Sequence, residues 1–553
     1  MLTGSTLRRR ALLLLLPGMV ALAACSSTTQ QAADAPPATG ATGANGTADG
    51  TTAGSPGAGS TSSVGGFAIA TVPERRDVQH LHYEIGPLEI QAGQNNITYS
   101  AEAGYPTVPK PAEDGYITRI RANLERPDGT VPPVDVIHLH HGVWANVSGR
   151  PNPANAELFF AAGEEKTDTI LPAGYGYKYR ASDRWIINYM LHNLLSTPDE
   201  VRITYDIDFV PMRSDGAKEI TPARPIWMDV RTGEIYPVFD VLKGSGTDGT
   251  FTYPDQAADP YDGRRPMNEW TVDRDGVLIG TGGHLHPGGL HTDMYVTRPG
   301  AGATATDAAK ASITGDRAHV FRSEAQYFEP AGAVSWDVAM SVTLPEWKVA
   351  VEAGDTVSVT ATYDTARASW YESMGIMVMW MADGDAGTDP FVAPVDVKGV
   401  LTHGHLPEND NHGGQPSDLF LDLTAAPSGP TTGTVGITDF VYAPGDMAVG
   451  VGSSVPTVAP GGSIRFVNNE ATATTAGVWH TITACKAPCN AATGVAYPLA
   501  DADVQFDSGE LGDAGDPTAG RLDWTTPTDL ADGTYTYFCR IHPSMRGAFR
   551  VEG

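Results

Sequence analysis

A short segment near the C-terminus sets the tightest limit on how this chain can fold. Cys539, His542 and Met545 follow one another at intervals of three residues, directly after the aromatic run Tyr535–Phe538. A thiolate, an imidazole and a thioether, joined by a second imidazole, are the ligands of a trigonal copper with a weak axial methionine. His480 is the histidine that we expect to complete this set. The segment therefore predicts a blue-copper electron-transfer site (type 1 copper), formed where distant parts of the chain meet.

Short runs of β-branched and aromatic residues fill most of the remaining sequence. They are separated by breaks rich in Gly, Pro and Asp, and the chain contains 62 Gly and 41 Pro. No long segment shows the 3.6-residue apolar period of a helix. This pattern is typical of antiparallel sandwiches, and 553 residues suffice for three or four domains. We therefore predict an all-β protein: two jelly-roll-like antiparallel sandwiches followed by a Greek-key sandwich.

The N-terminal residues have the pattern of an export signal. The basic segment Leu7–Arg10 precedes an apolar run, Ala11–Val20, that is too short to span a bilayer. The segment Leu22–Cys25 resembles a bacterial lipobox, and the segment Arg9–Leu13 is weakly similar to a twin-arginine signal. We therefore expect a lipoprotein signal peptide (1–25) and a lipidated Cys25 that anchors the protein to the membrane, on the extracytoplasmic face of the bacterial cell envelope.

The residues after the leader predict a spacer. Residues 26–66 consist almost entirely of Ser, Thr, Ala, Gly, Pro, Gln, Asp and Asn. Such a composition cannot bury enough apolar surface to offset the entropy of ordering. We predict a disordered tether here, and no further membrane span after it, because no run of 18 apolar residues follows.

Charge and cysteine content exclude some functions. The net charge of -29 argues against a nucleic-acid partner, because binding to phosphates needs a basic surface. The chain has four cysteines, of which Cys485 and Cys489 lie four residues apart. These two are either a short-loop disulfide formed in an oxidising compartment or a soft pair that loads Cu(I).

Many central histidines occur in His-x-His pairs. Residues two apart on a strand point to the same face, so that one pair can chelate one metal ion. The blue-copper motif together with four such pairs is similar to the ligand set of multicopper oxidases. In that family, however, the copper cysteine lies between two cluster histidines, whereas Phe538 and Arg540 flank Cys539 here. We therefore reject that family. The pairs are His80/His82, His138/His140, His284/His286 and His403/His405.

A second resemblance accounts for more residues in the right order. Four segments carry it: Ile137–Trp144, Tyr189–His192, Gly283–His286 and Glu372–Met377. Together they resemble the copper type II, ascorbate-dependent monooxygenases, which are the peptidylglycine α-hydroxylating and dopamine β-monooxygenase relatives. The resemblance covers roughly residues 75 to 424.

This resemblance implies two unequal coppers of type 2. The electron-transfer copper would be held by His140, His141 and His192, although His138 shares a face with His140 and could replace His141. The oxygen-activating copper would be held by the catalytic residues His284, His286 and Met374. Three imidazoles support both Cu(I) and Cu(II), whereas a thioether in place of one imidazole favours Cu(I), the state that meets O2.

The chain departs from that family in its substrate residues. Peptide-processing members have an Arg two positions before the His-x-His pair and an Asn and a Tyr after the Met, where this chain has Gly282, Ile376 and Val378. A carboxylate anchor is therefore missing, and peptidylglycine is not the expected substrate. Ile376, Met377 and Val378 would instead line a site for a less polar substrate. The family's disulfides are also missing, because no cysteine lies between Cys25 and Cys485.

Other candidates have less specific interpretations. Met377, Met379 and Met381 alternate as core residues do, and we expect His80, His82, His291 and His319 to be structural or exposed. His403, His405 and His412 lie in a segment rich in Gly, Pro and Asn, which indicates a loop that binds a further metal or covers the active site.

The C-terminal segment resembles the cupredoxins, and its Cys539, His542 and Met545 spacing is most similar to the amicyanin and plastocyanin branch. The expected domains are residues 67–215 and 216–424 (the two monooxygenase-like sandwiches), 425–432 (a linker) and 433–553 (the cupredoxin).

Together these features predict a secreted copper monooxygenase. It would hydroxylate a C–H bond of an unknown organic substrate with O2, and the fused type 1 copper would pass electrons from an ascorbate-like reductant or a redox protein. The alternative is a non-catalytic electron-transfer or copper-binding lipoprotein.

Overall fold

The structure is a computed structural model that describes the following residues: 63–64, 67–134, 136–149, 156–195, 197–231, 237–261, 263, 266–328, 336–384, 387–404, 423–447, 454–470, 478–485, 504–512, 521–542 and 544–553. The predicted signal peptide, Cys25, nearly all of the tether, Cys489, His405 and His412 lie outside these residues. Residues Ser60–Gly553 form one compact unit.

Strands make up almost all of the regular structure, which confirms the predicted all-β sandwich architecture. The described strands do not close into a barrel. The helical elements that the structure describes are single turns: α1 (Ala301–Thr304) and the 3-10 turns η2 (Gly216–Glu219) and η3 (Lys310–Ser312). None of the described helices is long and apolar enough to cross a membrane.

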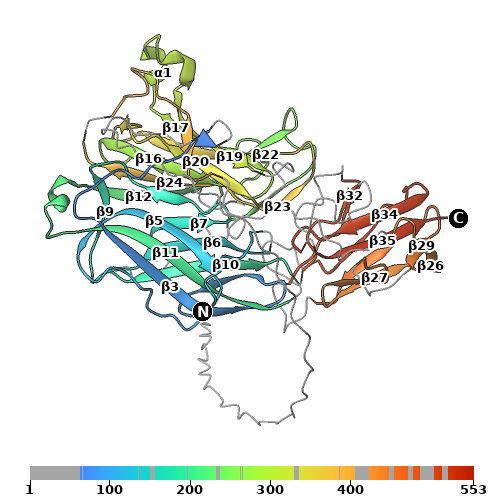
Figure 1. Cartoon of the computed structure of the whole chain (residues 1–553). Helices are drawn as coiled ribbons and strands as arrows, with labels where there is room; N and C mark the ends of the chain where they lie inside the picture. The colour runs from blue at the N-terminus through green and yellow to red at the C-terminus, as the bar shows by residue number, and fades with distance from the viewer. Residues whose placement is uncertain are drawn as a thin grey trace, which may run out of the picture. The chain divides into compact units, whose positions relative to one another are not determined.

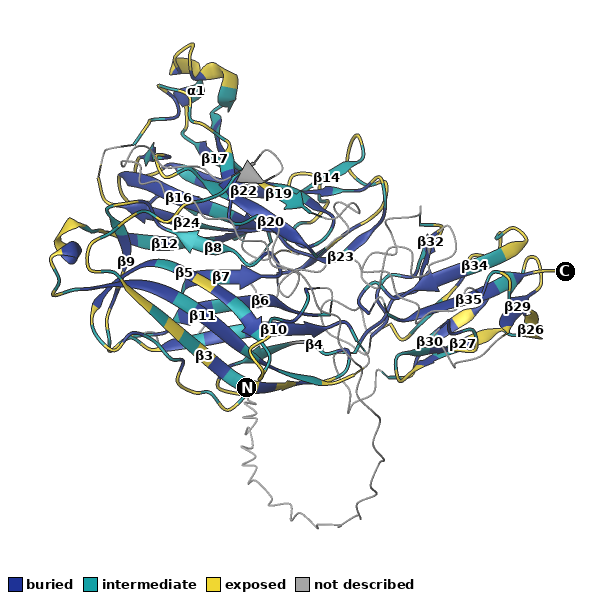
Figure 2. Cartoon of the chain, viewed as in Figure 1, coloured by how far each residue is buried: buried dark blue, intermediate teal, exposed yellow. Residues whose placement is uncertain are grey.

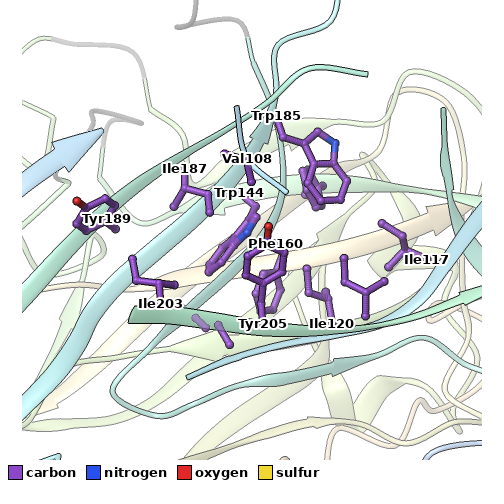
Figure 3. Close-up of a cluster of buried hydrophobic side chains, with 14 of the residues drawn as sticks. Val108, Ile117, Ile120, Trp144, Phe160, Trp185, Ile187, Tyr189, Ile203 and Tyr205 are labelled. Atoms are coloured by element: carbon purple, nitrogen blue, oxygen red, sulfur yellow. The ribbon is translucent and has the colours of Figure 1, made fainter. Parts of the chain in front are cut away.

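The first sandwich packs two sheets around one apolar core (Figure 1). One sheet has the strand order β4-β10-β6-β7, and strands β3, β5, β8, β9 and β11 oppose it. Trp144 and Phe160 from the first sheet meet Tyr205 from the second in the centre of this core (Figure 3). The bounds are β3 (Gln79–Ile90), β4 (Asn95–Tyr99), β5 (Gly115–Glu125), β6 (Ile137–Asn146), β7 (Glu157–Gly163), β8 (Asp168–Ile170), β9 (Tyr175–Tyr179), β10 (Trp185–Asn193) and β11 (Asp199–Pro211).

The second sandwich is continuous with the first through one parallel pairing, in which β12 meets β9 at Thr221–Tyr175 and Ala223–Tyr177. Strands β12, β24, β16, β20, β21 and β25 cover one side of its core, and β14, β15, β22, β17, β19 and β18 cover the other. The bounds are β12 (Thr221–Asp229), β14 (Thr250–Tyr253), β15 (Glu269–Thr271), β16 (Gly276–His284), β17 (Gly289–Thr297), β18 (Ile313–Thr314), β19 (Arg317–Tyr327), β20 (Val338–Thr343), β21 (Val349–Val351), β22 (Thr356–Asp364), β24 (Ile376–Ala382) and β25 (Gly399–Leu401).

Strand β24 shows how alternation decides which residues enter this core. Met377, Met379 and Met381 are at most 1% exposed and pack in the core of the second sandwich, as the sequence pattern indicates. Residues Ile376 and Val378 point to the opposite face, because successive side chains on a strand alternate. That opposite face is directed toward the first sandwich and the buried histidines described below.

The third sandwich is formed by the C-terminal residues. A six-stranded sheet of order β26-β29-β35-β34-β31-β32 packs on a four-stranded sheet of order β28-β27-β30-β33. Strand β26 lies inside the segment 425–432 that we expected to be a linker, and it pairs in parallel with β29. The bounds are β26 (Ser428–Thr431), β27 (Thr434–Thr438), β28 (Val441–Ala443), β29 (Val455–Val458), β30 (Arg465–Asn468), β31 (Thr483–Cys485), β32 (Phe506–Asp507), β33 (Asp523–Thr525), β34 (Gly533–Phe538) and β35 (Arg546–Val551).

Two short strand pairs complete the described elements. They are β1 (Ser63–Val64) with β2 (Phe67–Ala68), and β13 (Phe239–Val241) with β23 (Trp370–Ser373). Burial differs sharply between strands of the first sandwich. β6 is buried along nearly its whole length, whereas exposed residues alternate with less exposed ones along β3 (Figure 2). The polar side chains of β6 are therefore inside the protein, and all three of its histidines are among them.

Candidate metal centres

The C-terminal centre is formed by three fully buried side chains. His480 precedes β31, and Cys539 and His542 lie in the loop between β34 and β35. Cys539 Sγ lies 3.8 Å from Nδ1 of each histidine, and the two Nδ1 atoms are 3.2 Å apart.

These separations fit a trigonal metal site. With metal bonds of about 2.0 Å to nitrogen and about 2.3 Å to sulfur, angles of 120° separate the nitrogens by about 3.5 Å and nitrogen from sulfur by about 3.7 Å. The three donor atoms therefore need almost no movement to bind one ion. Met545 is also buried, and its backbone closes the loop: Cys539 N donates to Met545 O, and Met545 N donates to His542 O.

The surroundings of Cys539 favour its thiolate form. The backbone N–H groups of Thr481 and His542 both donate to Sγ at 3.4 Å. Burial alone would raise the pKa of this thiol, but hydrogen bonds and charge from His480 and His542 outweigh it and hold the pKa well below its usual value. A thiolate is the form that binds a metal.

Each histidine of this centre is held through its second nitrogen. His480 Nε2 contacts Glu470 Oε2, and His542 Nε2 donates to the carbonyl of Gly93 at 3.0 Å. Such partners fix the ring and leave the other nitrogen for the metal. Gly93 has a φ of 57°, and a Cβ there would lie 1.9 Å from Phe440, so that glycine is required at this contact.

The central histidines come first from the neighbouring strands β6 and β10. His192 on β10 pairs directly with His138 on β6. The register then shifts, because Met190 pairs with His141 and Leu191 with Leu139. His140 is thus the extra residue of a β-bulge, a feature that re-aims side chains.

His138, His140 and His192 lie together as one group. The ring centroid of His138 is 4.9 Å from that of His192 and 6.0 Å from that of His140, and His140 is 5.9 Å from His192. His138 Nδ1 donates to Val134 O, and its buried Nε2 has no hydrogen-bond partner. Trp336 covers the group, with its ring 4.4 Å from His138.

Burial keeps these imidazoles neutral. It lowers the pKa of His138 to about 4 and that of His192 well below its usual value, and the neighbouring histidines lower the pKa of His192 further. A neutral imidazole is the form that coordinates a metal.

A second group lies on the other side of His140. His284 ends β16, His286 follows it, and Glu164 follows β7 of the first sandwich. One ligand atom from each of the three lies within 4.8 Å of the others, and all three residues are buried. The ring of His286 is 4.2 Å from that of His140, so that the two groups are adjacent.

Contacts with a carboxylate and a backbone carbonyl orient this group as well. His284 Nδ1 lies 2.9 Å from Glu165 Oε2, and His286 Nδ1 donates to Glu372 O. The Nε2 atoms of both rings are buried and have no hydrogen-bond partner. Burial would lower the pKa of His284, but the charge of Glu165 raises it to about 9, while burial raises the pKa of Glu164 to about 8.

Two predicted ligands have surroundings that differ from those of the rest. His141 Nε2 donates to Asn188 Oδ1 at 3.0 Å, and burial together with the charge of His284 lowers the pKa of His141. Met374 is 1% exposed and belongs to an apolar cluster with Met190 and Ile541. Both remain predictions as metal ligands.

The C-terminal centre touches the central histidines through His192. His192 Nε2 donates to the carbonyl of Ile541 at 2.9 Å, and Ile541 directly precedes His542. The rings of His192 and His542 are 6.1 Å apart. The buried Nδ1 of His192 has no hydrogen-bond partner, so that this atom is available to a central metal.

A small cavity of ≈ 60 Å³ adjoins the second group. Its polar part includes His284 and Glu165, and its apolar wall includes Ile376, Val378 and Trp380. Gly282 also lines it. Of the three residues that we expected at a substrate site, Ile376 and Val378 line this cavity, whereas Met377 lies in the core.

The remaining described histidines pair with carboxylates or backbone. The exposed side chains of His80 and His82 contact Asp208 and Asp206, respectively, on the neighbouring strand β11. His291 and His319 both contact the buried Asp293. His403 Nε2 donates to Glu165 O at 2.7 Å, so that the described end of the His403–His412 segment reaches the second group.

Several residues of these centres escaped the sequence analysis. Glu164 and Glu165 directly follow the buried apolar strand β7, and this adjacency is the signal that could have identified them. Glu470, Asn188 and Trp336 have no comparable signal, because their roles depend on contacts between distant strands.

Comparison with known proteins leaves the family open. No protein-family model matches the chain, and no curated protein matches it. Among solved structures, a Cu-containing nitrite reductase (NirK) from Thermus scotoductus SA-01 is 16% identical at a TM-score of 0.15, over 50% of this chain and 55% of that one. The chain thus spans little more than half the length of that enzyme.

Viral structures are the next matches. Sulfolobus Turreted Icosahedral Virus is 7% identical at a TM-score of 0.22, over 55% of this chain and 90% of that one. The VP2 subviral particle of infectious bursal disease virus is 10% identical at a TM-score of 0.16, over 60% of this chain and 80% of that one. None of these scores is high enough to assign a function.

Proposed function

We propose that this chain is a copper-dependent oxidoreductase that hydroxylates a C–H bond with O2 and receives its electrons through the C-terminal copper. The observation that carries this proposal is the position of His192. Its ring lies 4.9 Å from that of His138 on one side, and its Nε2 donates to the carbonyl next to His542 on the other. One side chain thus joins the two histidine-rich centres, as electron transfer between them requires.

The donor sets fit copper at both centres. A thiolate with two imidazoles and a methionine suits an ion that cycles between Cu(I) and Cu(II), and the group of His138, His140 and His192 is an all-imidazole site. His138 takes the position that the family resemblance gives to His141. Bound copper would supply one-electron redox chemistry and the activation of O2.

The overall reaction needs an external reductant. One oxygen atom of O2 enters the C–H bond, the other leaves as water, and two electrons and two protons are consumed. We propose an ascorbate-like reductant or a redox protein as the donor, and a lipid anchor at Cys25 that holds the enzyme at the extracytoplasmic face of the cell envelope.

The cavity beside His284 supports a small and mostly apolar substrate. Its walls include Ile376, Val378 and Trp380, and Gly282 offers no charge to an acidic group. An apolar cavity of about 150 Å³ is known to hold benzene, so that the cavity here, at ≈ 60 Å³, suits molecules smaller than benzene. Thr281 and Thr343 add hydroxyl groups that can orient the substrate.

The test is oxygen incorporation by the copper-loaded full chain. Metal analysis should give about three coppers per chain. With a reductant, ¹⁸O2 and a panel of small apolar compounds, one labelled atom should appear in the product and one in water. A chain that binds one copper, or that reduces O2 only to water with every compound, would refute the hydroxylase.

The second candidate is an electron-transfer or copper-carrying protein without hydroxylase activity. The burial of the central histidines favours it, since each of the five in the two groups is at most 8% exposed. This candidate predicts stable copper binding and reversible reduction, with O2 uptake that does not respond to any organic compound.

A further inference from the structure

We propose that Glu164 is a ligand of the metal held by His284 and His286, which makes this centre a site of two histidines and one carboxylate. The inference deepens the proposed function, because it concerns the same central metal. It differs from the ligand set that the family resemblance implies, in which a methionine takes the third position.

The first argument is convergence. Glu164 comes from the first sandwich, whereas His284 and His286 come from the second. One ligand atom of each nevertheless lies within 4.8 Å of the other two. Buried polar groups are normally hydrogen-bonded, and buried charges are paired or bind a metal, so that three converging ligand atoms favour a bound ion here.

The second argument is that the donor atoms are unsatisfied. Glu164 is 2% exposed, and neither of its carboxylate oxygens has a hydrogen-bond partner. The Nε2 atoms of His284 and His286 are buried without partners too. A buried carboxyl group without a partner is unfavourable in its ionised form, and a bound cation removes this cost.

The neighbouring glutamate shows that the lack of partners is specific. Glu165 Oε1 accepts hydrogen bonds from Gly163 N and Thr167 Oγ1, and Oε2 contacts His284. Glu165 is therefore a positioning residue for the imidazole, as carboxylates often are at metal-bound histidines. Glu164 has no such role, and its free oxygens are left for the ion.

The backbone of Gly163 makes the approach possible. It pairs with His141 at the end of β7. A Cβ on Gly163 would lie 2.8 Å from His284 Cε1 and 2.7 Å from Glu165 Oε2. The absence of a side chain therefore lets the two glutamates reach across from one sandwich to the histidines of the other.

A carboxylate changes which ions the centre prefers. Thioether ligands favour Cu(I), whereas imidazole with carboxylate suits divalent ions, and a set of two histidines and one carboxylate with open positions is typical of non-haem Fe(II) oxygenases. The centre should therefore take a divalent first-row transition ion. Loading the protein separately with Cu(II) and with Fe(II), and comparing the two affinities, shows which ion the centre prefers.

The test compares Glu164→Gln with Met374→Leu in the full chain. Central metal affinity is measured by competition with a chelator, and the blue absorption of the C-terminal copper reports whether each variant is folded. We expect Glu164→Gln to lose about 100-fold or more in affinity and Glu165→Gln to lose about 10-fold to 100-fold, while Met374→Leu stays near wild type.

The outcomes separate this inference from the proposed function. If Met374→Leu loses the metal and Glu164→Gln keeps it, Glu164 is a neutral buried acid and the inference is wrong, although the hydroxylase proposal stands. If the wild-type chain binds no central metal, both fail. If Glu164→Gln binds weakly and its electron paramagnetic resonance spectrum changes while the blue band persists, Glu164 is a ligand.

Discussion

The C-terminal centre and the central histidines differ in how far apart in the sequence their residues lie. Cys539, His542 and Met545 lie in one loop of seven residues, and His480 comes from the segment that leads into an adjacent strand. The central groups draw instead on β6, the end of β7, β10 and the end of β16, which belong to two sandwiches. The first centre depends on the geometry of a loop, the second on the packing of separate sheets.

The chemistry of the two regions differs in the same direction. The C-terminal centre is built around a buried sulfur, whereas no cysteine lies within the central region. Around the central groups the structure places imidazoles and carboxylates, which are harder ligands. This difference suits a division of labour in which one region transfers electrons and the other uses them.

The largest expected effect comes from removing the sulfur. Cys539→Ser should abolish the intense blue absorption completely, because that colour needs a thiolate ligand, and should leave the central metals bound. Absorption spectra and metal analysis of the purified variant test this. Blue colour that survives the substitution would refute the assignment of Cys539, and loss of every metal would show that the regions are not separate.

The next effect concerns the side chain that joins the regions. His192→Ala should slow reoxidation of the C-terminal copper by O2 about 100-fold or more, because it removes both a ligand and the contact with Ile541. Stopped-flow absorption at the blue band measures this rate.

His80→Ala is the matched control for His192→Ala. The side chain of His80 is 78% exposed and contacts Asp208. We assign it no part in the connection between the two centres. It should behave as wild type. Equal rates in the two variants would break the proposed connection between the centres.

The local centre was the easier one to predict. The spacing of Cys539, His542 and Met545 places all three residues in one short loop between two strands, and the structure brings Cys539 and His542 together with His480. The all-β class was equally accessible, because alternation and frequent Gly and Pro breaks do not depend on tertiary contacts.

The central groups could be predicted only in part. The sequence contains the histidines, but the bulge at His140 decides which neighbours face one another, and a bulge is visible only once the register with β10 is known. Glu164 follows an apolar strand as any turn residue can, and it is 120 positions from His284. Nothing local links the two.

A smaller effect is expected at the close approach between the sandwiches. Gly163→Ala should destabilise the protein by about 1–3 kcal/mol and weaken the central metal, because the new Cβ would crowd His284 and Glu165. Gly433→Ala is the control, since nothing lies within 4 Å of a Cβ there. Chemical unfolding and chelator competition measure the two quantities. Central metal binding that is unchanged in Gly163→Ala would show that the sheets can separate without loss of the site.

The smallest effect tests a histidine cluster that we regard as structural. Asp293 is buried against His291, His319 and Arg322. Burial would raise its pKa, but hydrogen bonds from these three residues hold the pKa well below its usual value. A carboxyl group with a depressed folded-state pKa stabilises the protein above the unfolded-state pKa, and that contribution is lost as the pH falls toward the folded-state pKa.

Asp293→Asn should therefore lower the free energy of unfolding by about 2 kcal/mol near neutral pH and by progressively less below about pH 4. Urea unfolding of both proteins between pH 7 and pH 3 measures the difference, and the copper content should not change. Loss of copper from Asp293→Asn would mean that the cluster supports metal binding and that its purely structural role is wrong.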